Sequence, residues 1–250
     1  MRDEKTSKGL TLELRVFRPQ TFKSSQMVAA WPGMAFLARM SVDHLVRELD
    51  AKPFAEIHSR GNSVVVKDGV AEVSSAKSLF YSSSKLIIFS GEEQPTITED
   101  VYRMADMVMS FAQKCNVRRV YTIAAFPATF DAPPSVFAIA NNPRLLSELE
   151  RLSIPLLREG FVTGLNGVLI GVAEERDIDG ICLLGQVHSA SVPQPRTVKA
   201  VLDLLARILE VHIDTSALER EAELMEKTIR REVERHRPQR AKGQTQRYIS

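Results

Sequence analysis

Short runs that are apolar throughout, apart from Thr122 in one of them, alternate with longer segments of helical periodicity along most of this chain. The runs fall at residues 27–31, 86–89, 120–125, 136–140 and 181–184. An uninterrupted apolar run is typical of a strand that is covered on both faces. Strands that alternate with helices of ten or more residues favour a mostly parallel sheet between two helical layers. We therefore expect an α/β fold, a three-layer αβα sandwich with a mostly parallel mixed sheet.

One strand pair departs from this alternation. Valine-rich segments at 64–66 and 70–73 flank Lys67, Asp68 and Gly69, and Asp-Gly between two apolar runs is a hairpin signal. We expect an antiparallel pair appended to the sheet. The proline-rich stretch 126–134 is expected to form a long loop that serves function or oligomerisation.

Composition bounds the class of protein. The chain has 250 residues, of which 44% are apolar and 26% charged, values that are ordinary for a globular protein. It contains no 18-residue apolar run and no apolar signal segment at its start, so we expect a cytoplasmic protein with no membrane partner. Cys115 and Cys182 have no neighbours in metal-ligand spacing and are expected to be reduced core thiols.

Four segments are expected along the chain. They are a polar leader at 1–22, an α/β core at 23–213, a charged helix at 214–237 and a disordered basic tail at 238–250. Glutamates alternate with the basic residues of the helix, and Tyr248 is the one aromatic residue of the tail. These features favour a solvated helix with a frayed end and argue against nucleic acid as a partner.

The charged helix carries a narrow apolar seam. Its apolar positions recur at spacings of four, three, four and four: Leu218, Ala222, Met225, Ile229 and Val233. The seam can pack on its own domain or on another chain, and the sequence leaves both open. Leu218, Met225, Ile229 and Tyr248 are candidate contacts with another subunit or partner.

Two loops contain the candidate residues for a binding pocket or an anion site. Residues 160–167 form a glycine-punctuated turn that is expected to precede a helix at 168–176, and exposed amides at a helix start favour anions. Residues 90–95 follow an expected central strand, where open α/β sheets place their sites. A pocket or anion site would use Gly91, Glu92, Gly164, Asn166 and Gly167. The alternative is that the glycines serve close packing and that Glu92 lies in an exposed turn.

Motifs for other chemistry are not found in the sequence. It contains no GxxxxGK[ST] loop, no HExxH pair and no GxSxG elbow. The five histidines are dispersed along the chain. The sequence therefore predicts no catalytic residue, no metal ligand and no cofactor.

Four segments together resemble the proteasome assembly chaperone 2 family. They are Trp-Pro-Gly-Met at 31–34, Leu-Ile-Ile-Phe-Ser-Gly-Glu-Glu-Gln-Pro at 86–95, Gly-Leu-Asn-Gly at 164–167 and the run from 178 to 185. The resemblance implies a sandwich related to purine nucleoside phosphorylases that lacks their active site and acts by protein contact. It also implies self-association into rings of about three to five subunits. Some members end in a hydrophobic–tyrosine–any-residue tripeptide that docks on proteasome α subunits, whereas Tyr248 stands one position too early here.

The expected function is accordingly a non-catalytic, homo-oligomeric protein-binding module, a chaperone or scaffold for the assembly of protein complexes. Its expected partners are further copies of itself and proteasome subunits or another protein complex. The alternative is a small-molecule enzyme or nucleotide-binding protein with a phosphorylase- or hydrolase-like fold.

Overall fold

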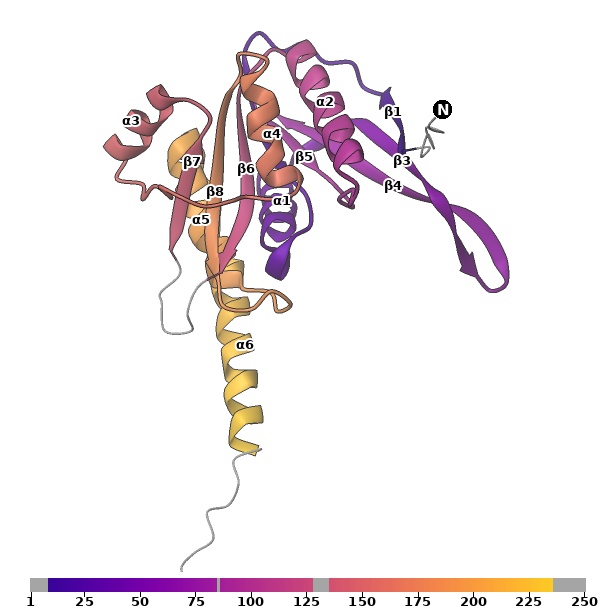
Figure 1. Ribbon diagram of the computed structural model, residues 1–250. Coiled ribbons are helices and arrows are strands. Elements are labelled where there is room, and N and C mark those ends of the chain that lie inside the picture. Colours follow the sequence, from indigo (N-terminus) through magenta and orange to yellow (C-terminus); the bar gives the residue numbers. More distant parts are fainter. Residues whose placement is uncertain (1–8, 85, 128–134, 236–250) are drawn as a thin grey trace, which may run out of the picture.

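A mixed sheet runs through the centre of the molecule (Figure 1). The computed structural model describes residues 9–84, 86–127 and 135–235. Within these residues eight strands pair in the order β1-β3-β4-β5-β2-β6-β8-β7. The strands are β1 Thr11–Val16, β2 Ser25–Ala30, β3 Lys52–Lys67, β4 Val70–Ser83, β5 Leu86–Ser90, β6 Val117–Pro127, β7 Val136–Ala140 and β8 Asp179–Val187.

The four central strands, β5, β2, β6 and β8, pair in parallel. Strand β2 lies between β5 and β6, and its residues Met27 to Ala30 are fully buried. Helices connect these strands, as the alternation of the sequence predicts. They are α1 Leu37–Glu48, α2 Thr98–Lys114, α3 Pro143–Arg151, α4 Leu165–Glu174, α5 Pro195–Leu209 and α6 Ser216–Arg235, with a short 3₁₀ turn at Met34–Phe36.

Two apolar layers cover the two faces of the sheet. Buried residues of α1 and α5 pack with Val28, Ile123 and Leu183 on one face. Buried residues of α2 and α4 pack with Met27, Ile87 and Val120 on the other. Alternate residues of each strand thus enter opposite cores. The predicted αβα sandwich is confirmed.

Antiparallel pairing is more extensive than one appended pair. Strand β7 runs antiparallel to β8 at one edge, and β1, β3, β4 and β5 are joined by three antiparallel pairings at the other. The hairpin predicted around Lys67, Asp68 and Gly69 is present, with arms of 16 and 14 residues that extend far beyond the valine-rich tip. The parallel part is therefore confined to the central four strands.

The expected leader at 1–22 contains a strand. Thr11–Val16 pairs with β3 between Ala55 and Arg60, and Leu12 and Leu14 pack against the core beneath α2. Charged residues alternate with these leucines on the exposed side, so the segment is polar in composition but amphipathic with a period of two. The sheet therefore begins at Thr11, before the predicted core boundary at residue 23.

Helix α6 lies within the predicted range of 214–237. The Asp214 carboxylate accepts a hydrogen bond from the backbone N–H of Ser216 at 2.8 Å, which satisfies one of the free amides at the helix start. The helix is described as far as Arg235, and the predicted disordered tail at 238–250 lies outside the described residues. Of the predicted proline-rich loop at 126–134, Phe126 and Pro127 instead pair within strand β6, and residues 128–134 lie outside the described residues.

Helix α4 begins earlier than predicted, at Leu165 instead of Val168. Its first turn contains Asn166 and Gly167, so the expected turn at 160–167 ends at Gly164. No helix in the described part of the chain is long and apolar enough to cross a bilayer.

Both cysteines are free and buried, as predicted. Burial raises the pKa of the Cys115 thiol to about 11 and that of the Cys182 thiol to about 12. The folded state therefore holds both protons more tightly than the unfolded state. The thiol contribution to the free energy of unfolding is fully present below pH 9, the ordinary thiol pKa, and is lost as pH rises through about 11.

We predict that neither thiol reacts with Ellman's reagent in the native protein at about pH 8, because the thiolate is the reactive form. Both should react once denaturant unfolds the chain. Absorbance at the thionitrobenzoate band measures the reaction. Rapid labelling of one thiol in the native protein would contradict the burial described here.

Candidate functional site

A cavity of about 480 Å³ lies at the carboxyl ends of the central strands. Residues 124–127 of β6, Leu184 of β8 and Gly33, which follows β2, line its floor and sides. The loop 161–164 and the first turn of α4 close it. The carboxyl edge of parallel strands is where open α/β sheets bind ligands. This cavity is therefore the first place to look for a site.

The Asn166 side chain binds the backbone at the end of β2. Its carbonyl oxygen accepts a hydrogen bond from the Trp31 N–H at 2.9 Å, and its amide donates to the Trp31 carbonyl at 3.1 Å. Both residues are buried. A buried backbone N–H and C=O must find partners, and Asn166 supplies both. The side chain thereby joins α4 to β2.

The Gln94 side chain makes a second link of the same kind. Its carbonyl oxygen accepts a hydrogen bond from the Leu165 N–H at 3.0 Å, and its amide donates to the Pro32 carbonyl. Gln94 follows β5, so the loop after β5, the loop after β2 and the start of α4 are tied together. We call this set, Asn166 and Gln94 with the backbone of residues 31, 32 and 165, the amide interlock.

Two glycines permit this close packing. A Cβ atom on Gly91 would lie less than 3.0 Å from the Trp31 indole. Gly164 has a φ of 73°, which L side chains rarely adopt, and a Cβ atom there would meet the Gln94 carbonyl oxygen. The structural alternative for these glycines thus accounts for their positions.

Four of the five residues predicted for a pocket or anion site lie at or near the cavity. Gly164 and Asn166 line the cavity. Gly91 lies beneath Trp31, and Gly167 lies against the Val162 carbonyl in the first turn of α4. These four surround one edge of the sheet, but the Asn166 side chain is bound to backbone. An anion site here remains a prediction.

Glu92, the fifth predicted residue, is exposed and does not line the cavity. Its carboxylate accepts a hydrogen bond from the Lys77 N–H at 2.6 Å. The last paired residues of β4 and β5 are Leu79 and Ser90, so Glu92 binds a strand-edge amide just beyond the ladder. This is the role of an edge cap, in a turn, as the alternative interpretation expected.

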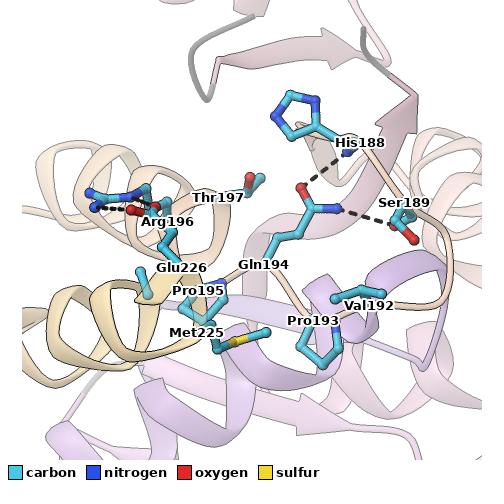
Figure 2. A pocket seen from close by; sticks show the side chains of 11 residues that line it. His188, Ser189, Val192, Pro193, Gln194, Pro195, Arg196, Thr197, Met225 and Glu226 are labelled. Atoms are coloured by element: carbon cyan, nitrogen blue, oxygen red, sulfur yellow. Dashed lines mark hydrogen bonds and ion pairs between the residues drawn. The ribbon is translucent and has the colours of Figure 1, made fainter. Parts of the chain in front are cut away.

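A second cavity, of about 350 Å³, lies between α6 and the segment that leads into α5 (Figure 2). We call it the α6 groove. It is lined by His188, Ser189, residues 192–197, Ala222, Met225 and Glu226. Gln194 holds the loop, since its side chain accepts a hydrogen bond from the His188 N–H at 3.1 Å and donates to the Ser189 carbonyl at 3.2 Å.

An arginine on α5 anchors α6 beside this groove. Arg196 pairs with Glu226 at 2.6 Å and with Glu219, and these two glutamates lie about two helical turns apart on α6. Leu218 and Ala222 are buried against the domain. Of the predicted contact residues, Leu218 is thus buried on its own domain and Met225 lines the groove. The Ile229 side chain and Tyr248 lie outside what the structure describes.

The sequence analysis did not predict the α6 groove or the amide interlock. The groove combines residues about 30 positions apart, and the only local signal was the pair of prolines at 193 and 195. For the interlock, the only local signal was the position of Asn166 and Gln94 just after a turn and a strand segment. The partners of these side chains are backbone groups, which a sequence pattern does not identify.

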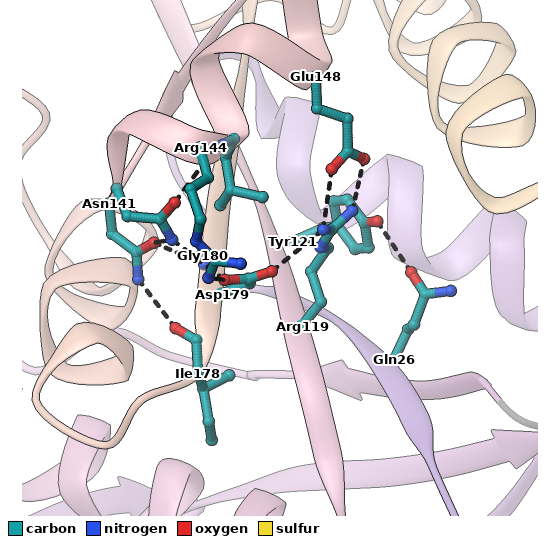
Figure 3. A network of polar contacts seen from close by, with 11 residues as sticks. Gln26, Arg119, Tyr121, Asn141, Arg144, Glu148, Ile178, Asp179 and Gly180 are labelled. Atoms are coloured by element: carbon teal, nitrogen blue, oxygen red, sulfur yellow. Dashed lines mark hydrogen bonds and ion pairs between the residues drawn. The ribbon is translucent and has the colours of Figure 1, made fainter.

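A polar network lies at the opposite, amino end of the parallel strands (Figure 3). Arg119 of β6 pairs with Glu148 at 2.6 Å and with Asp179 at 3.1 Å. Burial by itself lowers the pKa of the Arg119 guanidinium. Hydrogen bonds to Glu148, Tyr121 and Asp179 raise the pKa by more than burial lowers it, so the pKa lies above its ordinary value and the group stays charged. Tyr121 donates to Gln26 at 2.8 Å, and burial raises the pKa of its hydroxyl. This network joins β2, β6, β8 and α3.

A family model described as the PAC2 family matches residues 27–233, which is most of the chain. The chain belongs to the PAC2 family. The matched range extends from the first buried strand to the last turns of α6.

Solved structures of PAC2 type share the fold. The crystal structure of PbaB from Pyrococcus furiosus, titled an archaeal proteasome activator, is 25% identical with a TM-score of 0.75, covering 88% of this chain and 98% of that one. PbaA from the same organism, titled an archaeal homolog of proteasome-assembly chaperone, is 22% identical with a TM-score of 0.75, covering 89% and 92%. The uncharacterized protein MJ1210 of Methanocaldococcus jannaschii is 24% identical over 230 residues, covering 89% of this chain and 87% of its own.

Three of the four segments that carried the resemblance to PAC2 proteins meet in the amide interlock. The segment 31–34 supplies Trp31 and Pro32, the segment 86–95 supplies Gln94, and the segment 164–167 supplies Leu165 and Asn166. In this PAC2 chain these residues hold strand ends together. Their hydrogen bonds and close contacts give them a structural role at the position where related α/β folds place chemistry.

We predict that Asn166→Ala lowers the free energy of unfolding by about 3 kcal/mol, because it leaves the buried N–H and C=O of Trp31 without partners. Urea denaturation followed by circular dichroism measures the change. Thr163→Ala is the matched control, since Thr163 is exposed and also borders the cavity. Equal midpoints for the two variants would show that the interlock contributes nothing.

Proposed function

We propose that this PAC2 chain is a non-catalytic, homo-oligomeric protein-binding module of the proteasome-assembly-chaperone type. The observation that carries the proposal is the distal part of the β3–β4 hairpin, residues 61–76, which we call the hairpin arm. Figure 1 shows it projecting beyond the helical layers. Its exposed valines are Val64, Val65, Val66, Val70 and Val73.

Neither edge of the hairpin arm has a partner strand among the described residues. Strand β3 pairs with β1 only as far as Arg60, and β4 pairs with β5 only from Leu79. The chain before β1 turns towards α2, since Asp100 accepts a hydrogen bond from the Leu10 N–H at 2.9 Å. The described leader therefore does not lie along the arm.

The valines occupy both faces of the arm. Val64 lies opposite Val73, and Val65 and Val70 fall on the other face because neighbouring residues of a strand alternate. Their side chains are 45–64% exposed. A two-stranded ribbon alone is marginally stable in water, and exposed apolar clusters mark interaction surfaces. Contact with a neighbouring protein would bury these side chains.

The cavity at the strand ends supports binding over catalysis. The described residues that line it include no aspartate, glutamate, histidine, cysteine, lysine or arginine. The two amide side chains at its edge, Asn166 and Gln94, bind backbone groups. Acid–base and nucleophilic catalysis require a side chain that can exchange a proton or attack, placed at the reacting atoms.

The comparisons supply the type of partner. PbaB is titled a proteasome activator and is 25% identical to this chain over nearly its full length. By this likeness we propose copies of the chain itself, in a ring of about three to five subunits, and proteasome subunits or a comparable complex as partners. A cytoplasmic setting is part of the proposal. In this proposal the arm contacts the neighbouring copy, in a head-to-tail contact that generates a ring when the rotation between copies closes.

Light scattering coupled to gel filtration tests the proposal. We predict an oligomer at micromolar concentration for the native chain and a smaller mass for the triple variant Val64→Thr, Val66→Thr and Val73→Thr. Threonine keeps the β-branched shape that suits a strand but replaces a methyl group by a hydroxyl. A second variant, Val65→Thr with Val70→Thr, changes the opposite face, and comparison of the two masses shows which face makes the contact. A monodisperse native monomer would contradict homo-oligomerisation, and unchanged masses in both variants would exclude the arm.

The cavity favours a second candidate, a small-molecule enzyme or nucleotide-binding protein of the same fold, because of its place at the strand ends. For this candidate we predict that millimolar phosphate or nucleoside raises the melting temperature, because a ligand bound to the native state stabilises it. Gly164→Ala, which narrows the cavity beside Gln94, should abolish the shift. An unchanged melting temperature in the native chain would reject the candidate.

A further inference from the structure

We propose that an extended, uncharged segment of a partner protein binds as an added strand along β6, in the cavity at the carboxyl ends of the central strands. We call this cavity, of about 480 Å³, the strand-end cavity. The inference rests on the proposed function in one respect, because it takes the chain to be a protein-binding module. It names a different surface from the hairpin arm, and it does not depend on self-association.

Strand β6 continues past the end of its pairing with β2. That pairing extends only to Thr122, opposite Ala29, whereas the pairing with β8 on the other side continues to Pro127. Among the described strands, none lies beside residues 123–127 on the β2 side. Alternate residues of a strand direct their backbone N–H and C=O groups to the same side, and these groups need hydrogen-bond partners. This edge of β6 can therefore accept a further strand.

The amide interlock explains why β2 does not fill this position. Trp31 directly follows β2, and the Asn166 side chain binds both its N–H and its C=O. The chain then leaves the line of the strand, and Gly33 borders the cavity. The strand-end cavity thus takes the place beside β6 that a longer β2 would occupy.

The shape of the strand-end cavity follows the edge of β6. Four consecutive residues of the strand, 124–127, line it. Because consecutive side chains alternate between the two faces of a sheet, a cavity over one face would touch only every second residue. At roughly 3.3 Å per residue, the unpaired stretch 123–127 is about 16 Å long. An extended segment of about five residues matches this length.

Apolar walls lie on both sides of the edge. Met34 and Ala38 line the cavity from the start of α1, and Phe161 and Val162 line it from the loop that leads into α4. The described lining residues include no charged side chain. A strand that is covered on both faces is apolar at successive positions. The cavity therefore fits an uncharged, apolar segment, since a buried charge would lose its hydration without gaining a partner.

Two of the lining side chains are exposed in the chain alone. Phe161 is 99% exposed, and Met34 is 39% exposed. Ala35 and Phe36, which follow Met34, both have a φ of 54°, a strained conformation for residues that carry a side chain. Strained backbone is concentrated at sites that hold a ligand. Phe161 and Met34 would cover a bound segment from its two sides.

The recessed position of the edge indicates the kind of partner. The edge lies between the turn at 34–36 and the loop 161–164, so it admits a single extended chain more readily than the edge of a folded sheet. In strand addition, main-chain hydrogen bonds supply affinity and side-chain pockets supply selectivity. Protein chains that are not yet folded or assembled expose apolar segments of this kind. The partner is therefore an unassembled chain that presents such a segment.

Fluorescence anisotropy with labelled peptides and the full chain tests the proposal. The probe has the core Val-Ala-Leu-Ala-Val between Gly-Lys ends that keep it soluble. Two further probes carry N-methyl groups, on the odd and on the even residues of the core. Only alternate N–H groups of an added strand face β6, so we predict that one methylated probe binds at least about tenfold more weakly and that the other retains its affinity. Aspartate in place of the central leucine should also weaken binding at least about tenfold.

The variant Phe161→Ala tests the site. Phe161 is almost fully exposed, so its truncation leaves folding unchanged, and we predict about tenfold weaker binding of the probe. Phe17→Ala is the matched control, because Phe17 is 49% exposed and follows β1 at the opposite side of the sheet from β6. This control should bind as the native chain does. In nuclear magnetic resonance spectra, the probe should shift the amide signals of residues 123–126 most.

The outcomes separate this inference from the proposed function. No binding at millimolar peptide, or equal affinities of the two methylated probes, would overturn the added strand. Binding of phosphate or nucleoside in the cavity without binding of the peptide would assign the cavity to a small molecule. A chain that self-associates but binds no peptide refutes this inference alone. A monomer that binds the peptide refutes the proposed self-association alone.

Discussion

The hydrogen bonds between the Asn166 side chain and the Trp31 backbone are the contact on which this architecture most depends. Trp31 directly follows strand β2, which pairs on both sides, with β5 and with β6, and so joins the two halves of the parallel sheet. The Trp31 ring packs 4.8 Å from the Phe89 ring, and Gly91 leaves room for it. Because Asn166 stands in the first turn of α4, the same two bonds fix where that helix begins. At the carboxyl edge of the sheet, hydrogen bonds from amide side chains to backbone groups thus hold the end of β2 against the start of α4.

The two amide side chains at the strand-end cavity, Asn166 and Gln94, are bound to main-chain groups. Most of the remaining lining is apolar, and Thr163 is the one hydroxyl among the described lining residues. The hairpin arm extends from the centre and carries exposed valines with no partner strand among the described residues. A rigid centre with extended, apolar projections is well suited to holding other protein chains in place.

The sequence predicted the centre of the fold better than its edges. The apolar runs at 86–89 and 181–184 identify buried parallel strands because both faces are covered, which leaves no polar position. Strand β1 was missed because only one face of an edge strand is buried, so Leu12 and Leu14 alternate with charged residues. The start of α4 was misplaced because Gly167 resembles a turn residue, although it lies in a helix against the Val162 carbonyl. Gly164 and Asn166 line the cavity, but the backbone partners of the Asn166 side chain could be identified only from the fold.

The central claim is that this PAC2 chain acts through protein contacts around a rigid sheet edge. Hydrogen–deuterium exchange of the native chain, compared below and above micromolar concentration, tests both parts of this claim in one measurement. The account predicts that amides of residues 61–76 exchange more slowly at the higher concentration, while the buried Trp31 amide exchanges slowly at both. Exchange in the hairpin arm that does not change with concentration, together with rapid exchange at Trp31, would contradict it.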